Sequence, residues 1–323
     1  MRKAILLALA GAISFAAAAA AQSFPQKGKP ISLIVPSSAG GGTDTATRLL
    51  APLMEKDLGT SVVVVNKPGG SMQVGFGFVA GAKPDGHTLA MLIMPPAQSI
   101  YFDPQRKAPF ERNSLVPVGM YYGAPFAIVV SAKSPYKTLA DLVAAARAEA
   151  GKLNGGTTGF MASGHLALLA FEQGTKTKMT AVHYQGGGPL LAALLGGQID
   201  VTFNSIGELL AQKNAGAIRL LALMNDTRDP QIPDVPTVTE AGFTGVAPMG
   251  SYIGLAAPAG TPPDIIARLS VSLKKAVDDP ILKERMTGLG NTLIFTDPAG
   301  ANKFWDEADA RFKPLIESAP KSQ

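Results

Sequence analysis

Short runs of β-branched and other apolar residues alternate with helical patterns of hydrophobic positions along most of the chain. The apolar runs predict strands at Ile31–Val35, Val62–Val65, Thr88–Ile93, Phe126–Val130, Thr180–Tyr184, Ile199–Phe203, Arg219–Met224 and Tyr252–Ala256. The helical patterns lie at Asp44–Asp57, Leu139–Glu149, His165–Gln173, Pro189–Leu195 and Ile206–Asn214. This alternation predicts an α/β fold with largely parallel sheets.

Two segments that contain glycine and proline, residues 121–125 and 245–250, enclose a block with its own strand–helix–strand rhythm. The chain has 323 residues, which is more than a single hydrophobic core usually holds. We therefore predict a discontinuous first domain, residues 22–123 plus 248–323, and an inserted second domain, residues 124–247. Two crossovers between the domains form a natural hinge.

The first 21 residues have the pattern of a cleaved export signal. Arg2 and Lys3 precede an apolar stretch, Ala4–Ala20, and Ala19-Ala20-Ala21 matches a small-residue cleavage site. The alternative is an uncleaved anchor helix, for which the stretch is somewhat short. The chain has no cysteine, which excludes a lipid-modified cysteine and disulfides. We expect a soluble exported protein, located in the periplasm of a Gram-negative cell.

The charge of the chain does not indicate a nucleic-acid partner. Removal of the signal lowers the formal net charge from +5 to +3, and no basic run interleaved with aromatic residues is present. The sequence also contains no second apolar stretch long enough to span a bilayer. Contact with a membrane would therefore have to be made through a partner protein.

A glycine-rich loop leads from the first predicted strand into the first predicted helix, whose pattern opens at Thr43. A helix N-terminus presents unpaired backbone N–H groups and the positive end of the helix dipole, and glycines let a ligand approach them. No lysine or arginine lies between Ile31 and Thr47, so main-chain groups would have to supply the attraction. We interpret the segment as a carboxylate-binding loop with candidate contacts Ser37, Ser38, Ala39, Gly40, Gly41 and Thr43.

A second glycine-rich segment, Asn154–His165, leads in the same way into the helix predicted to begin at His165, with Ser163 as a fair N-cap. Two such loops, one in each domain, can hold an anion between two helix N-termini. The alternative is that both are ordinary tight turns. Four or five hydrogen bonds to a charged partner contribute about 6–15 kcal/mol gross, and a micromolar affinity needs about 8 kcal/mol net. An arginine is therefore not required.

Several other polar residues are candidates for the same cleft. Tyr184 and Gln185 follow a predicted strand, with a plain turn and a buried tyrosine as the alternative. Asn204 and Ser205 lie at a strand end, where open α/β sheets place ligands, although Ser205 also suits a helix cap. Asp44 lies in the first turn of its helix, where a carboxylate is favoured in any protein, but it can also meet an amino group of a ligand.

Signals for an enzyme, a cofactor or a metal are weak. The histidines are His87, His165 and His183, and none has the spacing of a metal site. Ser163 and His165 are two residues apart, so on a helix they point away from each other. Residues 75–80 match a dinucleotide-binding pattern by letters but lack its strand and its acidic partner. We expect no catalytic residues, cofactor or metal, and a Ser163-dependent hydrolase is the less favoured alternative.

Motifs in order along the whole mature chain resemble the solute receptors of tripartite tricarboxylate transporters, also called the Bug family. They are VPSSAGGGTDTATRLLAPLMEKDLG, VVVVNKPGG, AKPDGHTLAML, SGHLAL, VHYQGGGPLLAALLGGQIDVTF, VPTVTEAGF and GLAAPAGTPPDIIARL. The resemblance implies a two-lobed, type II-like Venus-flytrap binding protein of the periplasm, which we expect to be a monomer. It also implies delivery of an organic carboxylate to two integral membrane subunits. By resemblance, the loops Ser37–Thr43 and Gly159–His165 hold one carboxylate through backbone amides, often with bridging waters.

The sequence departs from the usual family pattern in places that bear on the ligand. Gly70-Ser71-Met72-Gln73 replaces most of a glycine-rich run, and Tyr252 stands near a position where tryptophan is common. Apolar candidates for the cleft are Met94, Phe160, Met161 and Met249, whereas Gly164 is a candidate as part of the second loop. They suggest an aromatic or otherwise apolar-bodied mono- or dicarboxylate, with plain core residues as the alternative. A receptor that reports to a signalling partner instead of a transporter would share every pocket residue.

Overall fold

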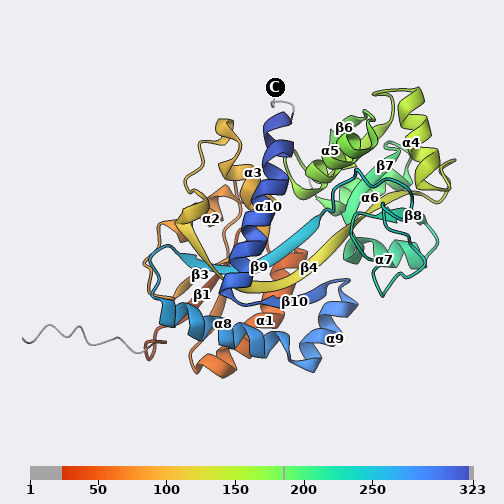
Figure 1. The fold of residues 1–323 in the computed structure, drawn as a ribbon. Helices are drawn as coiled ribbons and strands as arrows, with labels where there is room; N and C mark the ends of the chain where they lie inside the picture. Colours follow the sequence, from red (N-terminus) through yellow and green to blue (C-terminus); the bar gives the residue numbers. More distant parts are fainter. Residues whose placement is uncertain (1–23, 185, 320–323) are drawn as a thin grey trace, which may run out of the picture.

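The computed structural model describes residues 24–184 and 186–319, which form two lobes of α/β structure (Figure 1). The predicted signal segment, residues 1–21, lies outside the described residues. The strands follow the order β2-β1-β3-β9-β4-β7-β5-β6, and β8 and β10 also pair with β4. The α/β class is confirmed, but the prediction of largely parallel sheets is wrong. β3 is antiparallel to β9, and β4 is antiparallel to each of its strand partners.

The first lobe is built from both ends of the described chain. Its strands are β1 (Ile31–Val35), β2 (Val62–Asn66), β3 (Thr88–Met94), β9 (Gly250–Pro258), β10 (Thr292–Thr296) and the first part of β4 (Leu115–Ser131). Its helices are α1 (Gly42–Leu58), α2 (Gln73–Ala80), α3 (Pro96–Tyr101), α8 (Pro263–Val277), α9 (Pro280–Gly288) and α10 (Pro298–Ser318). Two 3₁₀ turns, Pro104–Arg106 and Arg112–Ser114, lead into β4.

The second lobe is formed by the segment between β4 and β9. It contains the second part of β4 together with β5 (Asn154–Thr157), β6 (Thr180–His183), β7 (Val201–Ser205) and β8 (Ile218–Leu223). Its helices are α4 (Leu139–Ala148), α5 (Ser163–Thr175), α6 (Gly187–Leu195) and α7 (Ile206–Asn214). Figure 1 shows these helices grouped apart from those of the first lobe, with α10 running up toward α5.

β4 crosses from one lobe to the other. Its residues up to Pro125 pair with β9, and from Phe126 onward they pair with β7 and β8. The chain returns at Met249, whose carbonyl accepts a hydrogen bond from the Phe126 N–H at 3.0 Å. The two crossings therefore lie beside each other, as a hinge requires. The boundaries at 123/124 and 247/248 stay predictions.

The sequence predicted only the second half of β4 because its first half contains features that usually end a strand. Pro117 and Pro125 cannot donate ladder hydrogen bonds, and glycine weakens a strand interior. The structure accommodates them through register shifts between Pro117 and Gly119 and between Met120 and Tyr122. The sequence predicted a loop at residues 154–157, but they form strand β5. Large side chains pack directly against its glycines, and a Cβ on Gly156 would lie 2.2 Å from Ile199 Cδ1.

Helix α1 carries the first glycine-rich loop at its N-terminus. It packs its apolar side through Ala46, Leu50 and Met54, all fully buried, and contacts α8. Pro52 lies inside the helix, and α1 continues to Leu58 before Gly59 closes it in a left-handed conformation with φ 69°. This packing fixes the direction in which the helix N-terminus points.

Candidate functional site

A cleft of about 400 Å³ lies between the two lobes, and we call it the interlobe cleft. The first lobe contributes the start of α1, the residue before α2, the end of β3, the start of α3, the middle of β4, the first part of β9 and the turn between α9 and β10. The second lobe contributes the segment before α5, the end of β7 and the start of α7. The lining residues are Gly40, Gly42, Thr43, Thr45, Met72, Ile93, Pro96, Tyr122, Ala124, Phe126, Thr158, Ala162, Ser163, Phe203, Asn204, Ser205, Gly207, Glu208, Ser251, Ile253, Leu289 and Asn291.

The N-terminus of α1 opens into this cleft. Gly41 is the N-cap residue, with extended φ −76° and ψ 169°, and in the part of the chain described here no side chain caps the helix. The first N–H groups of a helix have no intrahelical partner, so those of Gly42 and Thr43 are available to a ligand. Gly40 has φ 81°, a left-handed conformation that glycine adopts without strain.

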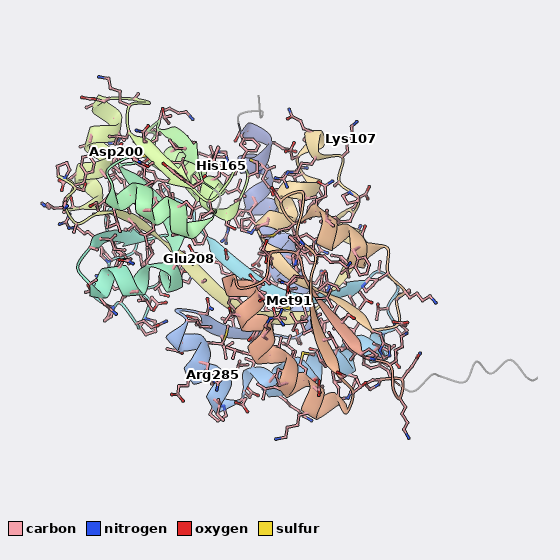
Figure 2. All side chains as sticks on the ribbon, turned by 180° about the vertical axis from the view of Figure 1, so that it is seen from behind. Met91, Lys107, His165, Asp200, Glu208 and Arg285 are labelled. Carbon is pink, nitrogen blue, oxygen red and sulfur yellow. The ribbon has the colours of Figure 1, made fainter. Side chains whose placement is uncertain are left out.

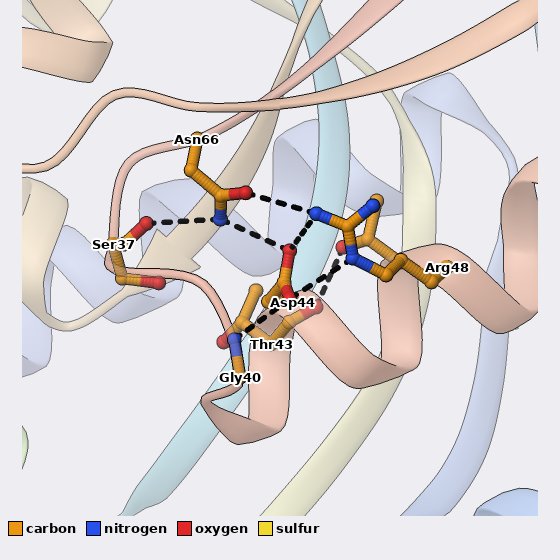
Figure 3. A network of polar contacts seen from close by, with 7 residues as sticks. Ser37, Gly40, Thr43, Asp44, Arg48 and Asn66 are labelled. Atoms are coloured by element: carbon orange, nitrogen blue, oxygen red, sulfur yellow. Dashed lines mark hydrogen bonds and ion pairs between the residues drawn. The ribbon is translucent and has the colours of Figure 1, made fainter.

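Asp44 holds the first loop in place from behind (Figure 3). Its buried carboxylate accepts hydrogen bonds from the Gly40 N–H at 2.8 Å, the Arg48 Nε–H at 3.0 Å and the Asn66 side-chain amide at 3.0 Å. The same Asn66 amide group donates to the Ser37 carbonyl at 3.1 Å. The bond from Arg48 lowers the pKa of Asp44 despite its burial. The structure therefore places the Asp44 carboxylate in an internal network and not among the residues that line the cleft.

Replacement of Asp44 by alanine is expected to destabilise the protein by about 2–3 kcal/mol, because three donors lose their acceptor. Since folding lowers the Asp44 pKa, its contribution is fully present above the unfolded value near 3.8 and is lost as the pH falls below it. Urea unfolding at pH 7 and at pH 3 measures both effects. Asp264→Ala is the control, because Asp264 also lies in a helix first turn but is exposed. Equal losses in the two variants would contradict the prediction.

The N-terminus of α5 lines the cleft from the second lobe. Ala162 is the N-cap residue, with φ −75° and ψ 168°, and the described residues provide no side-chain cap. Ser163 is therefore the first helical residue, and its expected role as N-cap is wrong because the extended backbone lies one residue earlier. Its hydroxyl accepts a hydrogen bond from Ser251 on β9 at 3.4 Å, which links the two lobes. Both glycine-rich segments thus present helix N-termini to one cleft.

The structure brings five of the sequence-predicted site residues into the lining of the interlobe cleft: Gly40, Thr43, Ser163, Asn204 and Ser205. The others are not among the residues that line it. They are Ser37, Ser38, Ala39, Gly41 and Asp44 around the first loop, Gly159, Phe160, Met161, Gly164 and His165 around the second, and Met94 and Tyr184 elsewhere. Gln185 lies outside the described residues.

His165 supports the second loop from inside the lobe (Figure 2). It is 2% exposed, and its Nδ1 accepts a hydrogen bond from the Met161 N–H at 3.0 Å. Burial lowers its pKa to about 4, so the ring is neutral near pH 7. Phe160 and His183 pack against it with ring centroids 5.3 Å and 4.8 Å away. The His165 ring is held in place by this packing. The hydroxyl of Ser163 is hydrogen-bonded to the hydroxyl of Ser251.

The apolar surface of the cleft comes from residues that the sequence did not single out. Tyr122, Phe126 and Phe203 line it, and burial raises the pKa of Tyr122 to about 12 while its interaction with Thr43 opposes the rise. By contrast, Met94 and Met249 are fully buried in the core. Strand periodicity could not identify Tyr122, because the first half of β4 was not predicted. Phe126 and Phe203 lie in predicted strands, but the pattern does not tell which face of a strand meets a ligand.

Glu208 was also missed, and it is the acidic side chain that lines the cleft. It lies in the first turn of α7 and is exposed toward the cleft, where its Oε2 accepts a hydrogen bond from Asn204 Nδ2 at 3.0 Å. The surrounding walls desolvate the carboxylate and raise its pKa, and the bond from Asn204 acts in the opposite direction. The pattern Ser205-x-x-Glu208 was a signal in the sequence, but it indicates a capping box and not a ligand contact.

The described residues that line the cleft include no lysine, arginine or histidine. They also include no group of three or more His, Cys, Asp or Glu side chains arranged to hold a metal, and the rest of the described chain has none either. Attraction for an anion therefore comes from the two helix N-termini and from hydroxyl and amide groups. Nothing in this arrangement provides an activated nucleophile.

Two α/β lobes that are joined by paired crossings and enclose such a cleft define a solute-binding protein of the periplasmic type. Residues 46–320 match the model of the tripartite tricarboxylate transporter family receptor, and the chain belongs to that family. Receptors of this family are periplasmic substrate-binding proteins and not enzymes. They bind small carboxylates and work with membrane transporter components. Among the described residues, no helix has both the length and the hydropathy needed to cross a membrane.

Relatives and solved structures agree with this assignment. A protein encoded in the TAR-I ttuE-ttuC' intergenic region of Agrobacterium vitis is 34% identical over 94% of this chain and 86% of its own length. BugT of Bordetella pertussis is 28% identical over 97% of this chain and 94% of its own length. MatC of Rhodopseudomonas palustris with bound malate is 28% identical over 89% of this chain and 98% of its own, with a TM-score of 0.77. Rpa4515 of R. palustris with adipate is 26% identical over 89% of this chain and 96% of its own, with a TM-score of 0.78.

Proposed function

We propose that this protein captures an organic carboxylate in the interlobe cleft and delivers it to a tripartite tricarboxylate-type transporter. The observation that carries the proposal is that the helix N-termini at Gly42 and Ser163 line one cleft, where the described residues provide neither a side-chain cap for them nor a basic side chain. Residues 1–21 would direct export to the periplasm and be removed. The mature monomer would then meet two integral membrane subunits.

The proposed mechanism is a shift between open and closed arrangements of two domains, residues 22–123 plus 248–323 and residues 124–247. A carboxylate bound to one lobe adds contacts with the other only when the lobes close, so it favours the closed arrangement. The adjacent crossings at Phe126 and Met249 support a hinge at this place.

We further propose that the ligand has an apolar body, an aromatic ring included. The support comes from the apolar walls formed by Tyr122, Phe126, Phe203 and Ile253. It does not come from Met94 or the other residues that the sequence suggested. A cleft of about 400 Å³ has room for such a molecule.

Thermal unfolding of the mature protein with matched acids and methyl esters tests the carboxylate requirement. The panel contains benzoate, nicotinate, malate, adipate and citrate, each beside its ester. We expect at least one acid to raise the melting temperature and its ester to have no effect, because the ester carries no charge for the helix N-termini. Equal stabilisation by an acid and its ester would contradict the proposal. So would the absence of any stabilisation by the acids of this panel and by a native ligand released from the protein and identified by mass spectrometry.

A further inference from the structure

The interlobe cleft contains an acidic side chain, although the features described above suit an anion. Glu208 lies in the first turn of α7, on the side of the second lobe that faces the first (Figure 2). A carboxylate at this place repels negative charge and attracts positive charge or hydrogen-bond donors. The carboxylate of Glu208 therefore influences which acids the cleft can bind.

The usual structural role of a glutamate at this position is not filled by Glu208. In a capping box, Ser205 and Glu208 would each bond the other residue's backbone N–H. The structure shows Ser205 as the N-cap residue, but α7 has no side-chain cap in the described chain. Glu208 instead accepts from Asn204, whose Oδ1 accepts in turn from the Thr202 hydroxyl at 3.2 Å. Asn204 is thereby oriented so that its amide faces the glutamate.

The charge of Glu208 is not balanced by a basic side chain, since none of the ion pairs among the described residues includes it. It approaches the start of α6 closely: a Cβ on Gly187 would lie 2.9 Å from its Oε2. The positive dipole ends of α6 and α7 therefore already have an anion of the protein itself beside them. A second carboxylate of a ligand would have to share this place with Glu208.

We propose that Glu208 is a specificity-determining residue that selects acids whose far end carries an ammonium or hydroxyl group over acids with a second carboxylate there. This inference rests on the proposed function, because it assumes that the ligand's first carboxylate binds the N-termini of α1 and α5. An ammonium or hydroxyl donates to Glu208, whereas a second carboxylate meets a like charge within the cleft. A cleft lined only by neutral groups would not have this preference for an ammonium or hydroxyl group over a second carboxylate.

The test compares ligands of equal length in the mature protein by isothermal titration calorimetry. The pairs are 4-aminobutyrate with succinate, and 6-aminohexanoate with adipate. We expect the amino acid of at least one pair to bind 10-fold or more tightly than the diacid. Glu208→Gln keeps the size of the side chain and removes its charge, so the preference should fall by at least 10-fold. Glu208→Asp keeps the charge and should keep the preference, and Glu208→Ser is a second charge-removing variant should the glutamine variant not fold.

The outcomes separate the two proposals. If the acids bind but the preference is the same in the wild type and in the charge-removing variants, the role of Glu208 is wrong and the carboxylate cleft stands. If the diacid binds more tightly in the wild type, the role of Glu208 is also wrong. If neither these acids nor those of the methyl-ester panel bind, the proposed function fails, and the inference fails with it.

Discussion

Replacement of Gly42 by proline is expected to weaken carboxylate binding about 10- to 100-fold while the protein stays folded. Proline has no N–H, so the variant removes one donor from the N-terminus of α1. A hydrogen bond to a charged partner contributes about 1.5–3 kcal/mol, which corresponds to this loss of affinity. Proline is well tolerated at the first position of a helix, and Gly41 before it already has the extended backbone that proline requires.

Gly42→Ala is the matched control for this variant. A Cβ on Gly42 meets nothing within 4 Å, so alanine keeps the N–H and adds only a methyl group in open space. The same comparison is possible on α5, where Ser163→Ala removes the hydroxyl and Ser163→Pro removes the hydroxyl and the N–H. Titration calorimetry with an acid that the methyl-ester panel identifies measures all four affinities. If proline and alanine variants bind equally well at both positions, main-chain amides do not hold the carboxylate.

Substitution of Gly207 by alanine is expected to reduce affinity at least 10-fold by keeping the lobes apart. Gly207 in α7 of the second lobe meets the turn after α9 of the first lobe, and a Cβ there would lie 2.1 Å from the Leu289 carbonyl oxygen. Ordinary contact between non-bonded atoms begins near about 3.5 Å. Because the obstacle is backbone and not a flexible side chain, the two lobes have to move apart from the arrangement described here. Contacts that a ligand makes with both lobes are then lost together.

The measurement for Gly207→Ala combines affinity with lobe separation. Small-angle X-ray scattering with ligand should give a larger radius of gyration than for the wild type, and the melting temperature without ligand should be little changed. Gly188→Ala is the control, because Gly188 lies in the first turn of α6, also in the second lobe, and its Cβ meets nothing within 4 Å. A Gly207→Ala protein that binds and closes like the wild type would show that the contact with Leu289 plays no part in closure.

Local sequence patterns predicted the elements that carry the main-chain part of the site. Helix α7 was predicted with its observed ends, Ile206 and Asn214. The glycine-rich turns before α1 and α5 were predicted to lead into helix N-termini, although the N-cap of α5 was assigned to Ser163, one residue too late. These features depend on a few neighbouring residues, whose turn chemistry and periodicity can be read directly.

Long-range packing decided the remaining features. The first half of β4 is a strand because β9 and β10 flank it, although Pro117 and Pro125 disfavour strand locally. Met94 is buried in the core while its neighbour Ile93 lines the cleft. In a strand, successive side chains alternate between faces, and sequence alone does not tell which face meets the ligand.

The sequence by itself therefore determined that this protein has an α/β fold with two exposed helix N-termini suited to an anion. Only the tertiary structure decided that the two termini line one cleft, that Asp44 supports a loop and that Glu208 enters the cleft. The physical reason is separation along the chain. A helix terminus is formed by adjacent residues, whereas the neighbours of Glu208 at the cleft come from distant parts of the chain. Their arrangement depends on how β4 and β9 join the lobes.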